Sequence, residues 1–199
     1  MMNGQKTVPE VGIQMPTPEG KVSLDGKYCR KADLARAFLR LLCLLSSVIA
    51  VSFMVTSEQS ATISVYGFNL PVFSKWSFSS SFEYLVGISA AAAGHSLLQL
   101  VVSVVKLVNK TPVFPSRHHA WLVFACDQIF AYALMSAGAA ASGVTNLNRT
   151  GIKHSALPNF CKPLRHFCDQ VAVSITFTFF SCFLAATSTV LDVIWLSKN

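Results

Sequence analysis

Ionisable side chains interrupt several long hydrophobic runs of this chain. Asp127 lies in the run HAWLVFACDQIFAYALMSAGAAASGV, Arg40 and Asp192 lie in two other runs, and His95 lies near the middle of another. An acidic residue inside a membrane-spanning helix costs about 2.5 to 3.5 kcal/mol on insertion scales, so it is expected to face a bundle interior and to have a partner. Such groups form structural ion pairs in some proteins and carry ions or protons in others.

The runs that hold these residues are long enough to cross a membrane. Of the 199 residues, 52% are hydrophobic and 13% are charged, whereas roughly 25% are charged in a soluble protein. Each run reaches the roughly 20 residues that span the hydrocarbon core as a helix. We therefore predict an all-α membrane protein, a four-transmembrane-helix up-and-down bundle with spans at about 37–56, 84–105, 120–144 and 171–196.

Lys and Arg residues are distributed unevenly between the two sides of this predicted bundle. An even number of spans puts both termini on one side of the membrane. If that side is the cytosol, most of the Lys and Arg residues outside the spans are cytosolic, as the positive-inside rule requires. Residues 1–36 are then a cytosolic N-terminal tail, largely disordered because of its composition, and residues 197–199 a cytosolic C-terminal tail. The net charge of +7 indicates attraction to membrane lipid rather than to nucleic acid.

Depth along the spans ranks the partners of Asp127. In this orientation Asp127 lies roughly 10 Å and Arg40 roughly 5 Å from the inner boundary, at 1.5 Å per residue. Arg40 is the only basic residue within the runs, so Arg40 and Asp127 are the predicted intramembrane ion pair. Asp192 is the second choice of acid, near enough to the interface to be hydrated instead. For His95 we expect a hydrogen bond between helices, and a relay of ions or protons through His95 and Asp127 is the alternative.

Small residues recur at helical spacing in the second and third runs. Ala90 to Gly94 and Ala139 to Gly143 each follow a small-xxx-small pattern, which allows helices to approach closely. These faces are expected to lie in the bundle core, with a dimer interface as the alternative.

The paired cysteines of the second outer loop are expected to form a disulfide. Cys161 and Cys168 lie in NFCKPLRHFCDQ, on the side that faces an oxidising compartment. The alternative is a metal site with His166, but it would need a fourth ligand and lacks a zinc-type spacing, so we expect no metal. On the inner side, Cys29 precedes two basic residues and is a candidate for lipidation by palmitate.

The outer loops offer two further features. Asn148 begins the sequon Asn-Arg-Thr and is a glycosylation candidate because it lies outside in this topology. In the first outer loop, ATISVYGF alternates polar and apolar residues and predicts a short strand. We expect this loop to cover the end of the bundle, with a partner-binding surface as the alternative.

The order of these features resembles a known family. FLRLLCLLSSVIAVSFMVTSEQ resembles the first span of the Casparian strip membrane domain proteins and their CASP-like relatives in plants. FACDQIFAYALMSAGAAASG is similar to their third span, and NFCKPLRHFCDQ to their second outer loop with its two cysteines. The resemblance extends over all the spans. A first-span Arg and a third-span Asp are characteristic of the family, and here they are Arg40 and Asp127.

The resemblance implies a multi-pass plasma-membrane protein with cytosolic termini. It implies association with itself and with related CASP-like proteins, as homo- and heterodimers or larger oligomers. Strip-forming members build a membrane platform that recruits wall-modifying enzymes, so cell-wall-modifying proteins are further implied partners. The first outer loop of this chain lacks the aromatic and acidic signature of strip-forming members, so the resemblance is to the CASP-like branch.

The sequence shows no arrangement of residues typical of catalysis. It has no nucleophile beside a base, no carboxylate pair on one face and no phosphate-binding glycine loop, so we predict no enzyme and no cofactor. The expected function is a non-enzymatic plasma-membrane scaffold that self-associates and organises membrane domains and membrane–cell wall junctions. The alternatives are an ion or small-solute channel or transporter that uses the intramembrane Arg, Asp and His residues, and a regulatory subunit of another membrane protein.

Overall fold

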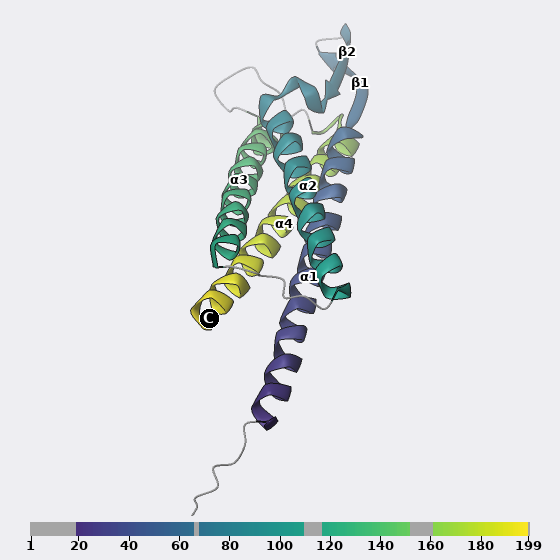
Figure 1. The fold of residues 1–199 in the computed structure, drawn as a ribbon. Coiled ribbons are helices and arrows are strands. Elements are labelled where there is room, and N and C mark those ends of the chain that lie inside the picture. Colours follow the sequence, from purple (N-terminus) through teal and green to yellow (C-terminus); the bar gives the residue numbers. More distant parts are fainter. Residues whose placement is uncertain (1–18, 66–67, 110–116, 152–160, 199) are drawn as a thin grey trace, which may run out of the picture. The chain divides into compact units, whose positions relative to one another are not determined.

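The computed structural model describes residues 19–65, 68–109, 117–151 and 161–198. The chain divides into two compact units, residues 1–32 and 33–199, and the second unit contains the helix bundle. Four long helices dominate the described residues: α1 (Glu19–Val55), α2 (Ser80–Val108), α3 (Arg117–Thr150) and α4 (Arg165–Lys198). Within the second unit these helices run alternately up and down (Figure 1).

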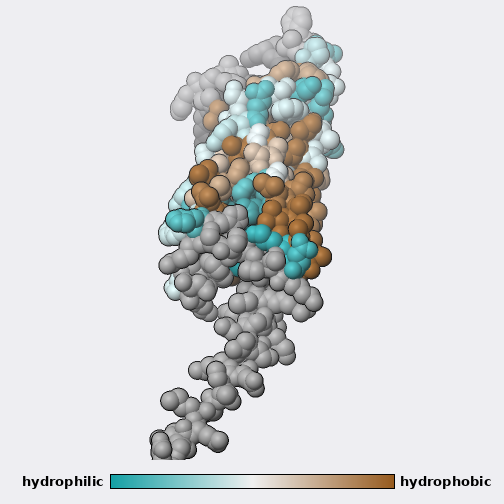
Figure 2. All heavy atoms as spheres, in the orientation of Figure 1, coloured by the Kyte–Doolittle hydropathy of each residue, from teal (hydrophilic) through white to brown (hydrophobic). Residues whose placement is uncertain are grey.

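Each helix contains a segment that is long and apolar enough to cross a membrane. The candidate spans are Leu34–Val55, Ser80–Val108, Ala120–Thr150 and Arg165–Ile194. Their outer faces carry large exposed hydrophobic side chains, such as Leu122, Ile129 and Tyr132 on α3. Hydrophobic residues also gather over the middle of the face shown in Figure 2. The predicted four-span helical membrane fold is confirmed.

Two helices extend further than the sequence predicted. The first begins at Glu19, so residues 19–36 are helical rather than a disordered tail, and residues 1–18 lie outside the described part of the chain. The sequence has no proline between Pro18 and Pro71, so nothing obliges the helix to stop at the membrane boundary. The last helix continues to Lys198 and therefore includes most of the predicted C-terminal tail.

A β-hairpin follows α1. Strands β1 (Glu58–Val65) and β2 (Phe68–Lys75) pair antiparallel, with Glu58 opposite Lys75. The predicted strand is present as β1 over residues 61–65, while residues 66–67 lie outside the described part of the chain, and β2 was not predicted. Its Pro71 argues against a strand, yet in a two-stranded sheet each strand is an edge, where a proline is tolerated. The short helix η1 (Trp76–Phe78) then leads into α2.

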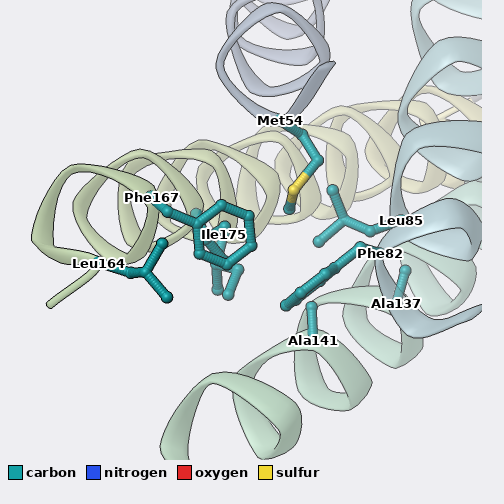
Figure 3. Close-up of a cluster of buried hydrophobic side chains, with 9 residues drawn as sticks. Met54, Phe82, Leu85, Ala137, Ala141, Leu164, Phe167 and Ile175 are labelled. Atoms are coloured by element: carbon teal, nitrogen blue, oxygen red, sulfur yellow. The ribbon is translucent and has the colours of Figure 1, made fainter. Parts of the chain in front are cut away.

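The apolar core lies at the end of the bundle that carries this hairpin, which we call the hairpin end. Met54 of α1, Phe82 and Leu85 of α2, and Phe167 of α4 are at most 4% exposed and point toward one another (Figure 3). The ring centroids of Phe82 and Phe167 lie 6.4 Å apart in an edge-to-face arrangement, which suits aromatic pairs. This cluster brings all four helices together where the outer loops begin.

Close packing between α3 and α4 depends on one glycine. A Cβ atom added at Gly138 would lie 3.0 Å from the ring of Phe179. The small-residue positions predicted for the core lie elsewhere: Ala90, Gly94, Ala139 and Gly143 are all exposed on the bundle surface. That prediction is therefore wrong, because the core-facing side of α3 carries Leu134, Ala137 and Ala141 instead.

Candidate functional site

A buried ion pair joins α1 to α3. The guanidinium of Arg40 binds both carboxylate oxygens of Asp127, and one of these bonds, from Nη1 to Oδ1, is 2.6 Å long. The two residues are 6% and 1% exposed. A bidentate bond between guanidinium and carboxylate is both strong and directional. It therefore fixes the rotation and the depth of α1 relative to α3.

A second ion pair joins α1 to α4. Arg36 Nε lies 3.2 Å from Asp192 Oδ1, and Arg36 Nη2 donates to the backbone oxygen of Leu191 at 3.2 Å. The expectation that Asp192 is hydrated is wrong, since this residue is only 2% exposed. Arg36, which we had placed in the cytosolic tail, is buried because it lies one turn before Arg40 on the same helix face. The two pairs meet, as Arg40 Nη2 is 3.9 Å from Asp192 Oδ2.

His95 connects α2 to the same site. Its Nε2 lies 2.9 Å from Asp127 Oδ1, a distance at which an Nε2–H donates to the carboxylate. The imidazole stacks on Phe130 of α3, with the ring centroids 4.7 Å apart. The histidine is thus hydrogen-bonded between helices, as the sequence led us to expect.

These five residues form what we call the charge cluster, to which every long helix contributes: Arg36, Arg40, His95, Asp127 and Asp192. The cluster contains two guanidinium groups and two carboxyl groups beside the imidazole. Removing one partner of such a buried pair is strongly destabilising, because the other charge is left uncompensated. The cluster is therefore suited to hold the helices in a single register.

A stripe of buried hydroxyl groups on α4 continues this polar contact toward the hairpin end. Ser181 Oγ lies 2.7 Å from Ser46 Oγ and accepts a bond from Ser47 Oγ at 3.2 Å, and Ser174 Oγ donates to the backbone oxygen of Ala50 at 2.7 Å. We call this the hydroxyl stripe; its members are at most 6% exposed and are Ser174, Thr178, Ser181, Ser188 and Thr189. This stripe was not predicted, although Ser174, Ser181 and Ser188 recur at a seven-residue spacing.

The disulfide lies at the hairpin end. Cys161 and Cys168 are bonded, with their Cα atoms 5.8 Å apart, so they do not form a metal site with His166. The hairpin is tied to the same region because Gln59 Oε1 accepts a bond of 2.9 Å from the backbone N–H of Phe167. This bond satisfies one of the free N–H groups in the first turn of α4.

Of the remaining predicted sites, Asn148 lies apart from the charge cluster. Asn148 is half-buried in the last turn of α3, ahead of Gly151, whose φ of 65° ends the helix. Cys29 belongs to α1, but its side chain lies outside the described residues. Within the described ranges no group of three or more His, Cys, Asp or Glu residues is placed to hold a metal ion.

Comparison with known proteins gives one family. The family model described as the Casparian strip membrane protein domain matches residues 29–184. CASP-like protein 3A1 from Vitis vinifera is 64% identical over 211 residues, covering 99% of this chain and 100% of the relative. CASP-like protein 3A2 from Populus trichocarpa is 61% identical over 207 residues, covering 100% of this chain and 99% of the relative.

A more distant relative is CASP-like protein 3A1 from Picea sitchensis, which is 55% identical over 185 residues, covering 88% of this chain and 90% of the relative. No solved structure matches. The range matched by the family model contains every member of the charge cluster except Asp192.

Proposed function

This chain belongs to the Casparian strip membrane protein family, and we propose that it acts as a non-enzymatic plasma-membrane scaffold that self-associates. In this proposal both termini are cytosolic and the hairpin end faces the cell wall. The partners are other copies of the chain, related CASP-like proteins and, at the hairpin end, cell-wall-modifying proteins. The chain thereby organises membrane domains at junctions between membrane and wall.

The observation that carries the proposal is that the intramembrane charges are bound to one another. Asp127 contacts both Arg40 and His95, and Asp192 contacts Arg36. Charged groups that serve a ligand or an ion usually face a water-filled cavity, whereas the side chains of Asp127 and Asp192 are at most 2% exposed. The cluster therefore supports a role in building the bundle. Other proteins would then bind to the outer faces of the helices.

Two small-residue patches on those outer faces support self-association. One consists of Ala90 and Gly94 on α2, the other of Ala139 and Gly143 on α3, and all four residues are exposed. A Cβ atom added at either glycine would meet nothing within 4 Å. In lipid, small residues let helix backbones approach closely, which favours association between helices.

The test uses two copies of the full chain with different tags, coexpressed and extracted in mild detergent. When one tagged copy is purified, the amount of the other copy that comes with it is measured. We expect Gly94→Leu combined with Gly143→Leu to lower this amount, because bulky side chains keep the backbones apart. Ala186→Leu, at an exposed position on α4, is the matched control and should leave recovery unchanged. Equal recovery for the patch variant and the control would refute self-association through these faces.

A channel or transporter remains the second candidate, and the hydroxyl stripe is the observation that favours it. Buried hydroxyls extend from the charge cluster toward the hairpin end, as a relay would require. Flux of protons or small ions into proteoliposomes that contain the purified chain separates the two functions. A scaffold gives no flux above that of protein-free vesicles. Flux that disappears in Asp127→Asn would establish the channel instead.

A further inference from the structure

A basic cavity opens between α3 and α4 at the hairpin end. Its volume is about 400 Å³. Arg149 contributes from the last turn of α3, Arg165 from the first turn of α4, and Lys162 from the turn that precedes α4. Asp169 lies on the next turn of α4 and is the one acidic residue among those that line the cavity. The charge cluster is buried among the helices and does not include these residues.

The charged groups of this cavity are exposed, and no partner among the described residues explains them. In the described part of the chain, none of Arg149, Lys162, Arg165 and Asp169 makes an ion pair or a side-chain hydrogen bond. The macrodipole of α4 disfavours a cation in its first turn, so Arg165 does not stabilise its own helix. The disulfide between Cys161 and Cys168 holds Lys162 close to that turn.

The depth of the cavity indicates what kind of ligand reaches it. The candidate span on α3 ends at Thr150, next to Arg149, and the candidate span on α4 begins at Arg165. Thr145 and Ala172 also line the cavity and lie roughly 6 and 10 Å deeper in the bundle than Arg149 and Arg165, at 1.5 Å per residue. The mouth therefore lies outside the predicted hydrophobic spans 120–144 and 171–196, at the level of lipid headgroups, and the floor lies at their boundary.

We propose that this cavity binds the headgroup of a glycerophospholipid. The three cations surround the phosphate, which guanidinium and ammonium groups bind through charge-assisted hydrogen bonds. Asp169 faces the ammonium group of a zwitterionic headgroup, and the acyl chains lie in the surrounding lipid. The proposal goes beyond the scaffold function, since it requires only that the helices span a membrane.

The test measures lipid retained by the purified full-length chain, with its disulfide intact, by native mass spectrometry. The probes are phosphatidylcholine, phosphatidylglycerol and the phosphate-free diacylglycerol. We expect both phospholipids to be retained in preference to diacylglycerol. Arg165→Gln should lower phospholipid occupancy roughly two- to fivefold, the range for one exposed charge contact. Lys75→Gln, at the same end of the bundle but outside the cavity, is the matched control and should leave occupancy unchanged.

Separate experiments test the role of Asp169 and the source of the phosphate. Asp169→Asn should shift retention from phosphatidylcholine toward phosphatidylglycerol, and an unchanged ratio would overturn the role of Asp169. Equal losses for Arg165→Gln and Lys75→Gln would overturn the site. Displacement of the lipid by inorganic phosphate or by a soluble galacturonate oligomer would also overturn it, because the cavity would then hold a free anion or a carbohydrate. Occupancy is counted on single chains, so failure of self-association does not affect this result.

Discussion

Replacing the two partners of the Arg40–Asp127 pair should have unequal consequences. In Arg40→Met, Asp127 remains buried with His95 as its one contact in the charge cluster. In Asp127→Leu, Arg40 keeps a second carboxylate nearby, because Asp192 Oδ2 lies 3.9 Å from its Nη2. The structure therefore predicts that loss of the cation is the more damaging change.

The size of the effect follows from the burial of these groups. Leaving a buried charge unpaired costs about 3 to 5 kcal/mol, which is the loss of unfolding free energy we expect for Arg40→Met. Asp127→Leu should lose about 1 to 3 kcal/mol, since a small movement of Arg40 toward Asp192 restores part of the interaction. The double variant removes both charges, so its loss should fall short of the sum by about 2 kcal/mol or more.

The assay is reversible unfolding of the purified chain from mild-detergent micelles by increasing amounts of sodium dodecyl sulfate, followed by near-UV circular dichroism. The wild type, the two single variants and the double variant form one thermodynamic cycle. Strict additivity of the two losses would show that the residues do not act as a pair. A larger loss for Asp127→Leu than for Arg40→Met would refute the idea that Asp192 serves as the reserve partner.

Two further changes test packing and the disulfide in the same assay. Gly138→Ala should lower the unfolding free energy by about 1 kcal/mol, because the added methyl meets Phe179 at 3.0 Å. Gly143→Ala has open space and should be neutral or slightly stabilising; equal results would argue against a close contact at Gly138. Replacing Cys161 and Cys168 by Ser should cost about 2 kcal/mol, as expected for a short closed loop. That variant should also lose the sensitivity to dithiothreitol that the wild type shows, and a wild type insensitive to reductant would contradict the disulfide.

The spans and the pairing of Asp127 with Arg40 could be predicted because they depend on local properties of the sequence. Hydropathy over about 20 residues marks a spanning helix without knowledge of the fold. Arg40 was the only basic residue in the hydrophobic runs, which left one strong candidate for Asp127. The partnership of Arg36 with Asp192 was missed, because a boundary drawn by hydropathy placed Arg36 outside the membrane. Helical continuity one turn before Arg40 would have shown that both arginines share a face.

Features that depend on contacts between distant segments could not be predicted in the same way. Serine and threonine in a span are compatible with several environments, so the hydroxyl stripe became evident only when Ser46 and Ser181 were found in contact. Likewise, the second strand of the hairpin contains Pro71, and only its pairing with β1 shows that this edge position tolerates proline. The small-residue patches have a clear helical pattern, but the pattern does not tell which side of the helix meets the core.

The charge cluster also constrains the order in which the protein is assembled. Arg40 is separated by 87 residues from Asp127, and Arg36 by 155 residues from Leu191, whose backbone it contacts next to Asp192. During synthesis the contact of Arg40 with Asp127 must therefore wait until α3 emerges, and the contacts of α1 with Leu191 and Asp192 until α4 emerges, at roughly 5 to 20 residues per second. Until α3 emerges, α1 carries Arg40 in an apolar segment without its carboxylate partner, which disfavours insertion of that helix. A chain truncated before α3 keeps that defect permanently, so the cluster distinguishes such chains from complete ones.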